Sequence, residues 1–295
     1  MTAETVTLSA SPWCLLLSAS AALALLTLSA VLQGTYRMLV KTSGDRVVLL
    51  GAANLVSVVA GVVGVVFVGP LPAVTWPYLV ASAGAYSAAM LAMAAGYRRV
   101  DLSVVGPQQE AFGVLFVAAF SVPVFGELIG WQHAAGFLLL VVGVVIAQPL
   151  RAAVGERLRV LGWATLFGAL IGCVWLIDFA AVRTVEDPFV YIVYNLMIGL
   201  PLVGWVAVTR RRTLREAVRR QLVPIAASAG LDIAAYGIIL WVVHTVRVAE
   251  VLPVVNLRIA VIALLGVVVL REPDTARRVA AASVLALGAA VANLA

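Results

Sequence analysis

Four ionisable side chains stand within long apolar stretches of the sequence: Glu110, Asp178, Asp232 and Arg258. A charge at the centre of a membrane-spanning helix costs at least about 2.5–3.5 kcal/mol, so each of these groups needs a compensating role. A buried acid can carry a proton or bind a cation, and the planar guanidinium group of an arginine can bind a carboxylate or a phosphate. These residues are therefore the first candidates for a functional site inside the molecule.

Glu110 and Arg258 each follow a proline within their apolar stretch, at Pro107 and Pro253. Proline removes a backbone donor and loosens the preceding turn, and paired interruptions of this kind indicate a transport site. Glu110 could carry a proton there, whereas Arg258 could bind an anionic substrate group or neutralise Glu110. Neighbouring polar residues extend the candidate site: Gln108, Gln109 and Asn256. The alternative is a buried structural ion pair beside two simple helix kinks.

The other two acids each have an aromatic neighbour at helical spacing. Trp175 precedes Asp178 by three residues, and Tyr236 follows Asp232 by four, so each pair shares a helix face. Either acid could face a cavity and bind a cationic substrate, or compete for Arg258. No catalytic, nucleotide-binding or metal-binding motif is present, and the two histidines are isolated, so we expect no metal and no cofactor.

Composition decides which elements position these residues. Of 295 residues, 63% are hydrophobic and 12% are charged, which excludes a soluble globular protein and a disordered chain. We predict an all-α membrane protein with ten transmembrane helices, because residues 62–68 and 138–142 are apolar at every position and a barrel strand would alternate. The predicted spans are 13–34, 47–68, 77–97, 102–125, 132–149, 160–182, 188–209, 223–244, 249–270 and 277–294.

The basic residues predict an orientation in the lipid bilayer. Of the 20 Lys and Arg residues, 17 fall on one side of the predicted spans, two on the other, and Arg258 lies within a span. Because cytoplasmic loops carry the excess of positive charge, this count places both termini outside the cell. The basic run at 210–220 is expected to anchor at anionic lipid headgroups, and we expect no nucleic-acid partner.

The two halves of the chain resemble each other. Residues 82–107 align with 228–253 at an offset of 146, and Pro107 matches Pro253. After one gap, the stretch ending at Glu127 matches the one ending at Glu272, and Gly143 matches Gly288. We predict two five-helix repeats, 1–149 and 150–295, which insert in opposite orientations because each has an odd number of spans. The repeated glutamates suggest a structural or gating role.

These residues resemble the drug/metabolite transporter superfamily, EamA type. The similarity includes the stretch from Gly34 to Lys41 and the stretch from Ala235-Tyr236-Gly237 through Asn256-Leu257-Arg258 to Arg271-Glu272-Pro273. The resemblance implies a multi-pass secondary transporter in the cytoplasmic (inner) membrane, without ATP, that exports a small-molecule substrate such as an amino acid, an amine or a drug-like compound. A coupling proton and a homodimer would fit such a protein. Family members usually have their termini inside, contrary to the charge count.

Two other classes of protein remain open. One is a membrane-embedded enzyme or lipid-handling protein, which would need a cluster of His or Asp residues at one interface. The other is a non-transporting structural subunit, in which Glu110 and Arg258 would bury each other and leave no polar cavity. A polar cavity between the spans that carry Glu110 and Arg258 would favour transport.

Overall fold

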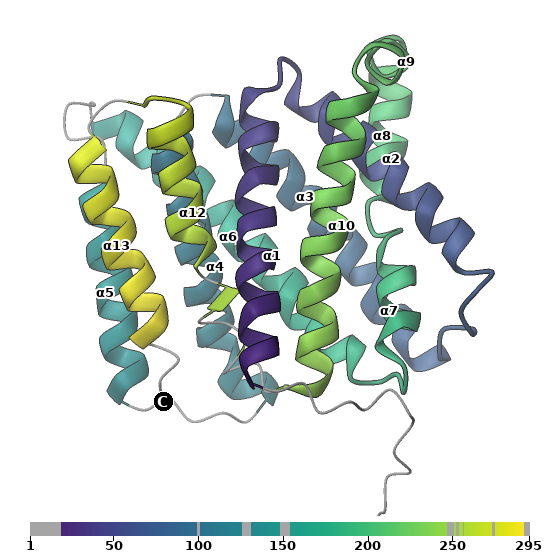
Figure 1. The fold of residues 1–295 in the computed structure, drawn as a ribbon, viewed down its shortest axis with the longest axis horizontal. Coiled ribbons are helices and arrows are strands. Elements are labelled where there is room, and N and C mark those ends of the chain that lie inside the picture. Colours follow the sequence, from purple (N-terminus) through teal and green to yellow (C-terminus); the bar gives the residue numbers. More distant parts are fainter. Residues whose placement is uncertain are drawn as a thin grey trace, which may run out of the picture.

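Helices alone make up the regular structure of the residues that the computed structural model describes, which are 19–98, 101–125, 131–147, 154–246, 251, 254–255, 257–272 and 275–291. The first sequence half contributes α1 (Ala19–Thr42), α2 (Arg46–Gly64), the 3-10 helix η1 (Ala73–Thr75), α3 (Trp76–Tyr97), α4 (Leu102–Phe125) and α5 (Trp131–Ala147). The second contributes α6 (Val154–Val182), α7 (Pro188–Asn195), α8 (Leu200–Thr209), α9 (Arg211–Arg220), α10 (Leu222–Thr245), α12 (Arg258–Leu264), the π-helical segment η2 (Leu265–Val269) and α13 (Thr275–Val291). The helices stand side by side as a bundle, with α5 and α13 together at one edge (Figure 1).

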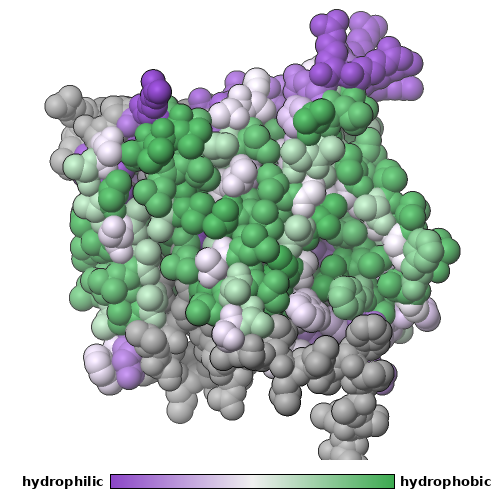
Figure 2. All heavy atoms as spheres, in the orientation of Figure 1, coloured by the Kyte–Doolittle hydropathy of each residue, from purple (hydrophilic) through white to green (hydrophobic). Residues whose placement is uncertain are grey.

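Six segments within these residues are long and apolar enough to cross a membrane: Ser20–Thr42, Arg46–Gly64, Ala73–Tyr97, Val154–Val182, Pro188–Thr209 and Leu222–Thr245. Large apolar side chains cover much of the outer face of the bundle, and polar side chains gather at its upper end (Figure 2). Phe67 and Val208 are more than four-fifths exposed, which suits a lipid environment and not water. The chain is therefore compatible with a multi-pass membrane protein, and the count of ten spans remains a prediction.

The first helix differs from its predicted span. We expected 13–34, whereas α1 continues to Thr42, and residues 13–18 lie outside the described part. The extension places Arg37 inside the bundle, where the residue is 5% exposed. Arg37 therefore does not belong among the 17 basic residues counted on one side of the predicted spans, and that count falls to 16. The asymmetry that predicts the orientation survives this correction.

Two predicted spans are interrupted helices. The span 188–209 is divided into α7 and α8, and the second of these begins with a proline, Pro201, near its first turn. A proline has no backbone N–H and suits the start of a helix better than its interior. The span 249–270 contains α12 followed by a π-helical turn, a geometry often found at functional sites. Arg258 is the first residue of α12.

The predicted gap 210–222 contains a short helix, α9, with strongly separated polar and apolar faces. Figure 1 shows α9 end-on above α10, so it lies crosswise to the bundle helices. Leu214 is buried on its inner face, and Arg210 beside it donates a 2.6 Å hydrogen bond to Asp45 at the start of α2. The purple side chains at the top of Figure 2 belong to this end of the molecule. A basic amphipathic helix in this position fits the predicted contact with anionic headgroups.

The helices α5 and α13 pack closely through glycines that correspond in the two sequence halves. A Cβ atom at Gly143 would lie 2.5 Å from Leu285 Cγ, and one at Gly288 would lie 2.8 Å from the backbone nitrogen of Leu140. At the offset of 145 that relates Gly143 to Gly288, Leu140 corresponds to Leu285. The contact is therefore reciprocal. Gly143 meets Leu285, and Gly288 meets Leu140, which is the residue that corresponds to Leu285 in the first half.

Gly288→Ala should lower the stability of the protein. The added methyl group would meet backbone atoms of α5, which cannot move aside as a flexible side chain can, and overpacking of this kind costs about 1–3 kcal/mol. The matched control is Gly230→Ala in α10, where a Cβ would meet nothing within 4 Å. We expect thermal unfolding in detergent to show a lower Tm for Gly288→Ala and an unchanged or higher Tm for Gly230→Ala. Equal melting temperatures would contradict the close packing.

Candidate functional site

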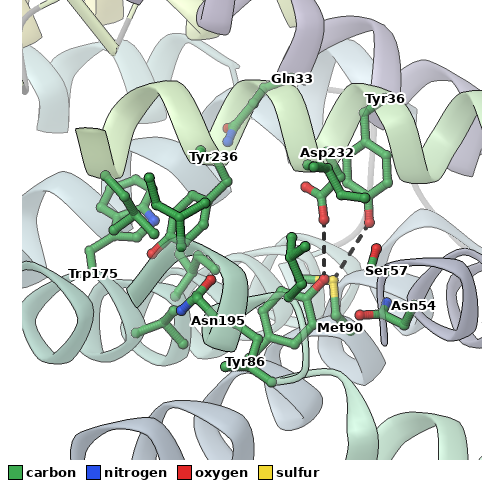
Figure 3. Close-up of a pocket in the computed structure, with 18 of the residues that line it drawn as sticks. Gln33, Tyr36, Asn54, Ser57, Tyr86, Met90, Trp175, Asn195, Asp232 and Tyr236 are labelled. Carbon is green, nitrogen blue, oxygen red and sulfur yellow. Dashed lines mark hydrogen bonds between the residues drawn. The ribbon is translucent and has the colours of Figure 1, made fainter. Parts of the chain in front are cut away.

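A cavity of about 60 Å³ is bounded by helices from both sequence halves, and we call it the central cavity. Its polar side chains come from α1, α2, α3, α7, α10 and α12, and those labelled in Figure 3 converge on one space. At about 10–15 Å³ per ordered water, this volume admits roughly four to six waters or a small solute. The polar lining residues are Gln33, Tyr36, Arg37, Asn54, Ser57, Tyr86, Asn195, Asp232, Tyr236 and Arg258.

Glu110 lies between two guanidinium groups at the edge of this cavity. Its Oε1 accepts a 2.8 Å hydrogen bond from Arg37 Nη2, and its Oε2 lies 2.7 Å from Arg258 Nη2. The second contact is an ion pair without hydrogen-bond geometry, so Nη2 and Nε of Arg258 remain free of hydrogen bonds. All three side chains are at least 94% buried. One carboxylate therefore compensates two buried cations.

Each guanidinium group also lies over an aromatic ring of α6. The Cζ atom of Arg258 is 4.2 Å from the ring centre of Trp175, and that of Arg37 is 4.7 Å from the ring centre of Phe167. Such contacts stabilise a cation in a site without water. Arg258 additionally donates a 2.6 Å hydrogen bond to Gln33 of α1. These contacts fix both arginines against α1 and α6.

Asp178 of α6 has a full set of neutral donors. It accepts hydrogen bonds from Tyr191 at 2.7 Å, Tyr236 at 2.7 Å and Asn195 at 3.1 Å. The donors belong to α7 and α10, so this buried carboxylate joins three helices. Asp178 does not line the central cavity itself. Instead, its carboxylate orients two residues that line the cavity, Tyr236 and Asn195, by accepting their hydrogen bonds.

Asp232 of α10 is the least satisfied of the three acids. It lines the central cavity and accepts a single described hydrogen bond, of 3.3 Å, from Tyr86 of α3. No described side chain forms an ion pair with it. Asp232 and Tyr86 are separated by 146 residues, which is the offset of the sequence repeat. The two side chains therefore occupy corresponding positions in the two halves and face each other.

The structure brings most of the predicted site residues together. Four of them line the central cavity, namely Trp175, Asp232, Tyr236 and Arg258, and Glu110 and Asp178 contact residues that do. Gln108 and Gln109 are fully buried but do not line the cavity, and their amide groups have no hydrogen-bond partner among the described residues. Asn256 lies outside the described residues. The residues described contain no group of three or more His, Cys, Asp or Glu side chains that could hold a metal ion.

Sequence reasoning missed the contribution of α1. Arg37 and Gln33 contact the predicted pair directly, but the first predicted span ended at residue 34. A signal was present, because Ser29, Gln33, Arg37 and Lys41 recur every four residues and form one polar stripe on a helix. In the structure this polar stripe faces the interior of the bundle, where Ser29, Gln33 and Arg37 are buried. Tyr86 had no such signal, since a tyrosine in a span also serves as ordinary packing.

A second cluster of charged groups lies at the start of α4. Arg271 adopts a left-handed conformation (φ 53°), after which Glu272 accepts hydrogen bonds from the backbone N–H groups of Leu102 (2.8 Å) and Ser103 (2.9 Å). Arg278 of α13 pairs with Glu272 at 2.8 Å and with Asp101 at 2.7 Å. Glu272 thus caps the first turn of a helix from the other sequence half. Glu127, its counterpart in the repeat, lies outside the described residues.

Comparisons with known proteins add support for the fold. No family model matches this chain, and no curated protein matches it. Among solved structures, 21 chains match. One, described as "Crystal structure of protein", has 16% sequence identity and a TM-score of 0.66 over 94% of this chain and 98% of that chain. At this identity the likeness concerns the fold alone.

Proposed function

We propose that this chain is a secondary transporter that moves a small polar metabolite across the cytoplasmic membrane by alternating access. The observation that carries the proposal is the central cavity, which receives polar side chains from both sequence halves, including charges of both signs. Charges inside a membrane bundle are costly and typically face a cavity or a transport path. A buried site between two halves of a bundle suits a protein that opens alternately to either side.

Reciprocal packing supports the proposed inverted repeats of ten spans, 1–149 and 150–295. In this arrangement α1 corresponds to α6, α3 to α10, and α5 to α13. The contacts follow that correspondence, because α1 packs on α10 while α6 packs on α3, and α5 packs on α13 through matched glycines. The interrupted span with α12 and η2 places Arg258 at a helix start within the bundle, as expected for a binding helix of such a transporter.

Membership of the drug/metabolite transporter superfamily, EamA type, is part of the same proposal, and it rests on the quoted sequence motifs. The sequence contains no nucleotide-binding motif, so the energy would come from an ion gradient, an exchanged solute or the gradient of the substrate itself. Export of an amino acid, an amine or a drug-like compound is what the resemblance implies, and a coupling proton and a homodimer belong to the same proposal. The basic residues at the end of the bundle that carries α9 favour that end in the cytoplasm.

The site meets one of the two expectations of the structural-subunit alternative. Glu110 and Arg258 do bury each other, as that alternative expects, but a cavity with ten polar or charged lining side chains lies beside them. The enzyme alternative expects His or Asp groups clustered at one interface. Instead, the acids Asp178 and Asp232 lie on helices that pack around the cavity, and His244 contacts the backbone of Val185. These observations favour transport over both alternatives.

Cysteine accessibility tests alternating access directly. We would place Ser57→Cys in the cavity wall of a protein lacking Cys14 and Cys173, and label it in oriented proteoliposomes with a membrane-impermeant thiol reagent. A transporter should be labelled from both sides, because the cavity opens in turn to each. The control is Ala111→Cys in α4, which is fully buried and should stay unlabelled. Labelling from neither side, together with no uptake of labelled amino acids or amines, would contradict transport.

A further inference from the structure

Three acids inside the bundle, Glu110, Asp178 and Asp232, differ in how many of their hydrogen-bond acceptor positions are occupied. An ionised carboxylate has about four lone-pair sites for hydrogen bonds. Asp178 accepts three hydrogen bonds, and Glu110 lies against two guanidinium groups. Asp232 accepts one long hydrogen bond and has no ion-pair partner among the described residues. Its carboxylate is therefore the acceptor group in the central cavity with room for a ligand.

The side chains around Asp232 suit an organic cation. Tyr36, Tyr86 and Tyr236 line the cavity with it, and Figure 3 shows Tyr36, Tyr86 and Met90 beside the carboxylate. The hydroxyl of Tyr36 donates to the sulfur of Met90, and that of Tyr236 donates to Asp178, so neither donor is available to Asp232. Aromatic ring faces and a carboxylate together attract ammonium groups. No described cation lies within ion-pair distance of Asp232, and Arg37, whose charge acts on it at longer range, is paired with Glu110.

The opposite side of the cavity carries the opposite charge. Trp175, which lies under Arg258, and Asp232 are on different sides of the space in Figure 3. Arg37 and Arg258 share one carboxylate, and two nitrogens of Arg258 make no hydrogen bond with any described residue. The wall between the two sides is largely aliphatic, with Ile171, Val174, Ile192, Leu196, Ile233 and Leu240 among the lining residues.

We propose that Asp232 binds the ammonium group of a small aliphatic amine, whose other end faces Arg258. This assignment rests on the proposed transport function and names the substrate class for it. The required group is the ammonium, because Asp232 lacks a counter-ion. A ligand with no ammonium group leaves Asp232 without an ion-pair partner.

Four ligands that share a 3-methylbutyl group test the ammonium requirement. Isoamylamine is a cation, leucine a zwitterion, 4-methylpentanoate an anion and N-acetyl-isoamylamine neutral. Because a ligand stabilises the state that it binds, saturable shifts of Tm on the purified protein report binding. Isoamylamine and leucine should raise Tm, and the other two should not. Stabilisation by 4-methylpentanoate or the acetyl derivative that equals that of the amine would overturn the proposal.

Variants locate the ammonium site. Asp232→Asn should lower the affinity for isoamylamine by about 10- to 100-fold, as expected for loss of a charge-assisted hydrogen bond. Asp232→Glu, which keeps the carboxylate, should bind better than Asp232→Asn. Asp45→Asn is the matched control, since Asp45 lies at the start of α2 in an exposed ion pair with Arg210. Unchanged affinity in Asp232→Asn would overturn the assignment.

Two further outcomes separate the amine site from the transport function. If Asp232→Asn abolishes pH-gradient-driven uptake of a solute that has no ammonium group, Asp232 is a proton site and the amine assignment fails. If no member of the series shifts Tm while Ser57→Cys is labelled from both sides, the assignment fails and transport stands. Should neither Asp232 variant fold, the charge series on the unaltered protein decides by itself.

Discussion

Glu110→Gln should lower the free energy of unfolding by about 3–5 kcal/mol, the usual effect of removing one partner from a buried ion pair. Gln keeps the size of the side chain but removes the charge, so Arg37 and Arg258 remain buried without a compensating anion. With stabilities of about 5–15 kcal/mol typical of folded proteins, this is a large fraction of the total. Unfolding by denaturant in detergent, followed by circular dichroism, measures the change.

Two variants show whether the effect comes from buried charge. Glu216→Gln removes the acid of an ion pair with Arg220 whose side chains are 61% and 78% exposed, and should have no measurable effect. The double variant Glu110→Gln with Arg37→Gln removes one cation with the anion and should be more stable than the sum of the two single changes indicates. A Glu110→Gln protein as stable as Glu216→Gln would contradict the charge compensation. The sequence left two roles open for Glu110, a proton carrier and a member of a buried ion pair. The observed pairing with two arginines favours a structural effect of its loss.

Glu272→Gln should destabilise the protein by about 3–5 kcal/mol, the usual effect of removing one partner from a buried ion pair, and it also weakens a helix cap. The carboxylate accepts hydrogen bonds from two backbone N–H groups of α4 and pairs with Arg278. A neutral amide accepts weaker hydrogen bonds and leaves Arg278 with Asp101 alone. Thermal unfolding gives the global effect, and hydrogen exchange at the Leu102 and Ser103 amides gives the local one.

Asp101→Asn is the matched comparison for Glu272→Gln. Both residues pair with Arg278, but the side chain of Asp101 is 46% exposed and that of Glu272 is 7% exposed. Solvent screens the exposed pair, so Asp101→Asn should change Tm much less. Faster exchange at Leu102 and Ser103 is expected in Glu272→Gln and not in Asp101→Asn. Equal effects of the two variants would show that the cap on α4 contributes little.

The sequence predicted a helical fold that suits a membrane, because every segment that crosses lipid must satisfy its own backbone hydrogen bonds. A long apolar helix satisfies its own backbone, so its existence can be inferred without knowledge of its neighbours. The boundaries were less certain. The first span was predicted to end at residue 34, whereas α1 continues to Thr42. Polar residues in a buried stripe and polar residues at a membrane surface have the same local composition.

The sequence by itself determined which charges are unusual. Glu110, Asp178, Asp232 and Arg258 stood out because an apolar helix tolerates a charge only when something compensates it. Only the tertiary structure decided which groups compensate each charge. Glu110 is paired with Arg37 and Arg258, and Asp178 accepts hydrogen bonds from three neutral donors. Asp232 accepts one 3.3 Å hydrogen bond, from Tyr86, which is 146 residues away in sequence. The partners come from other helices, at sequence separations that local patterns do not encode. Helix periodicity fixes which face a residue occupies, but the packing of helices fixes what that face meets.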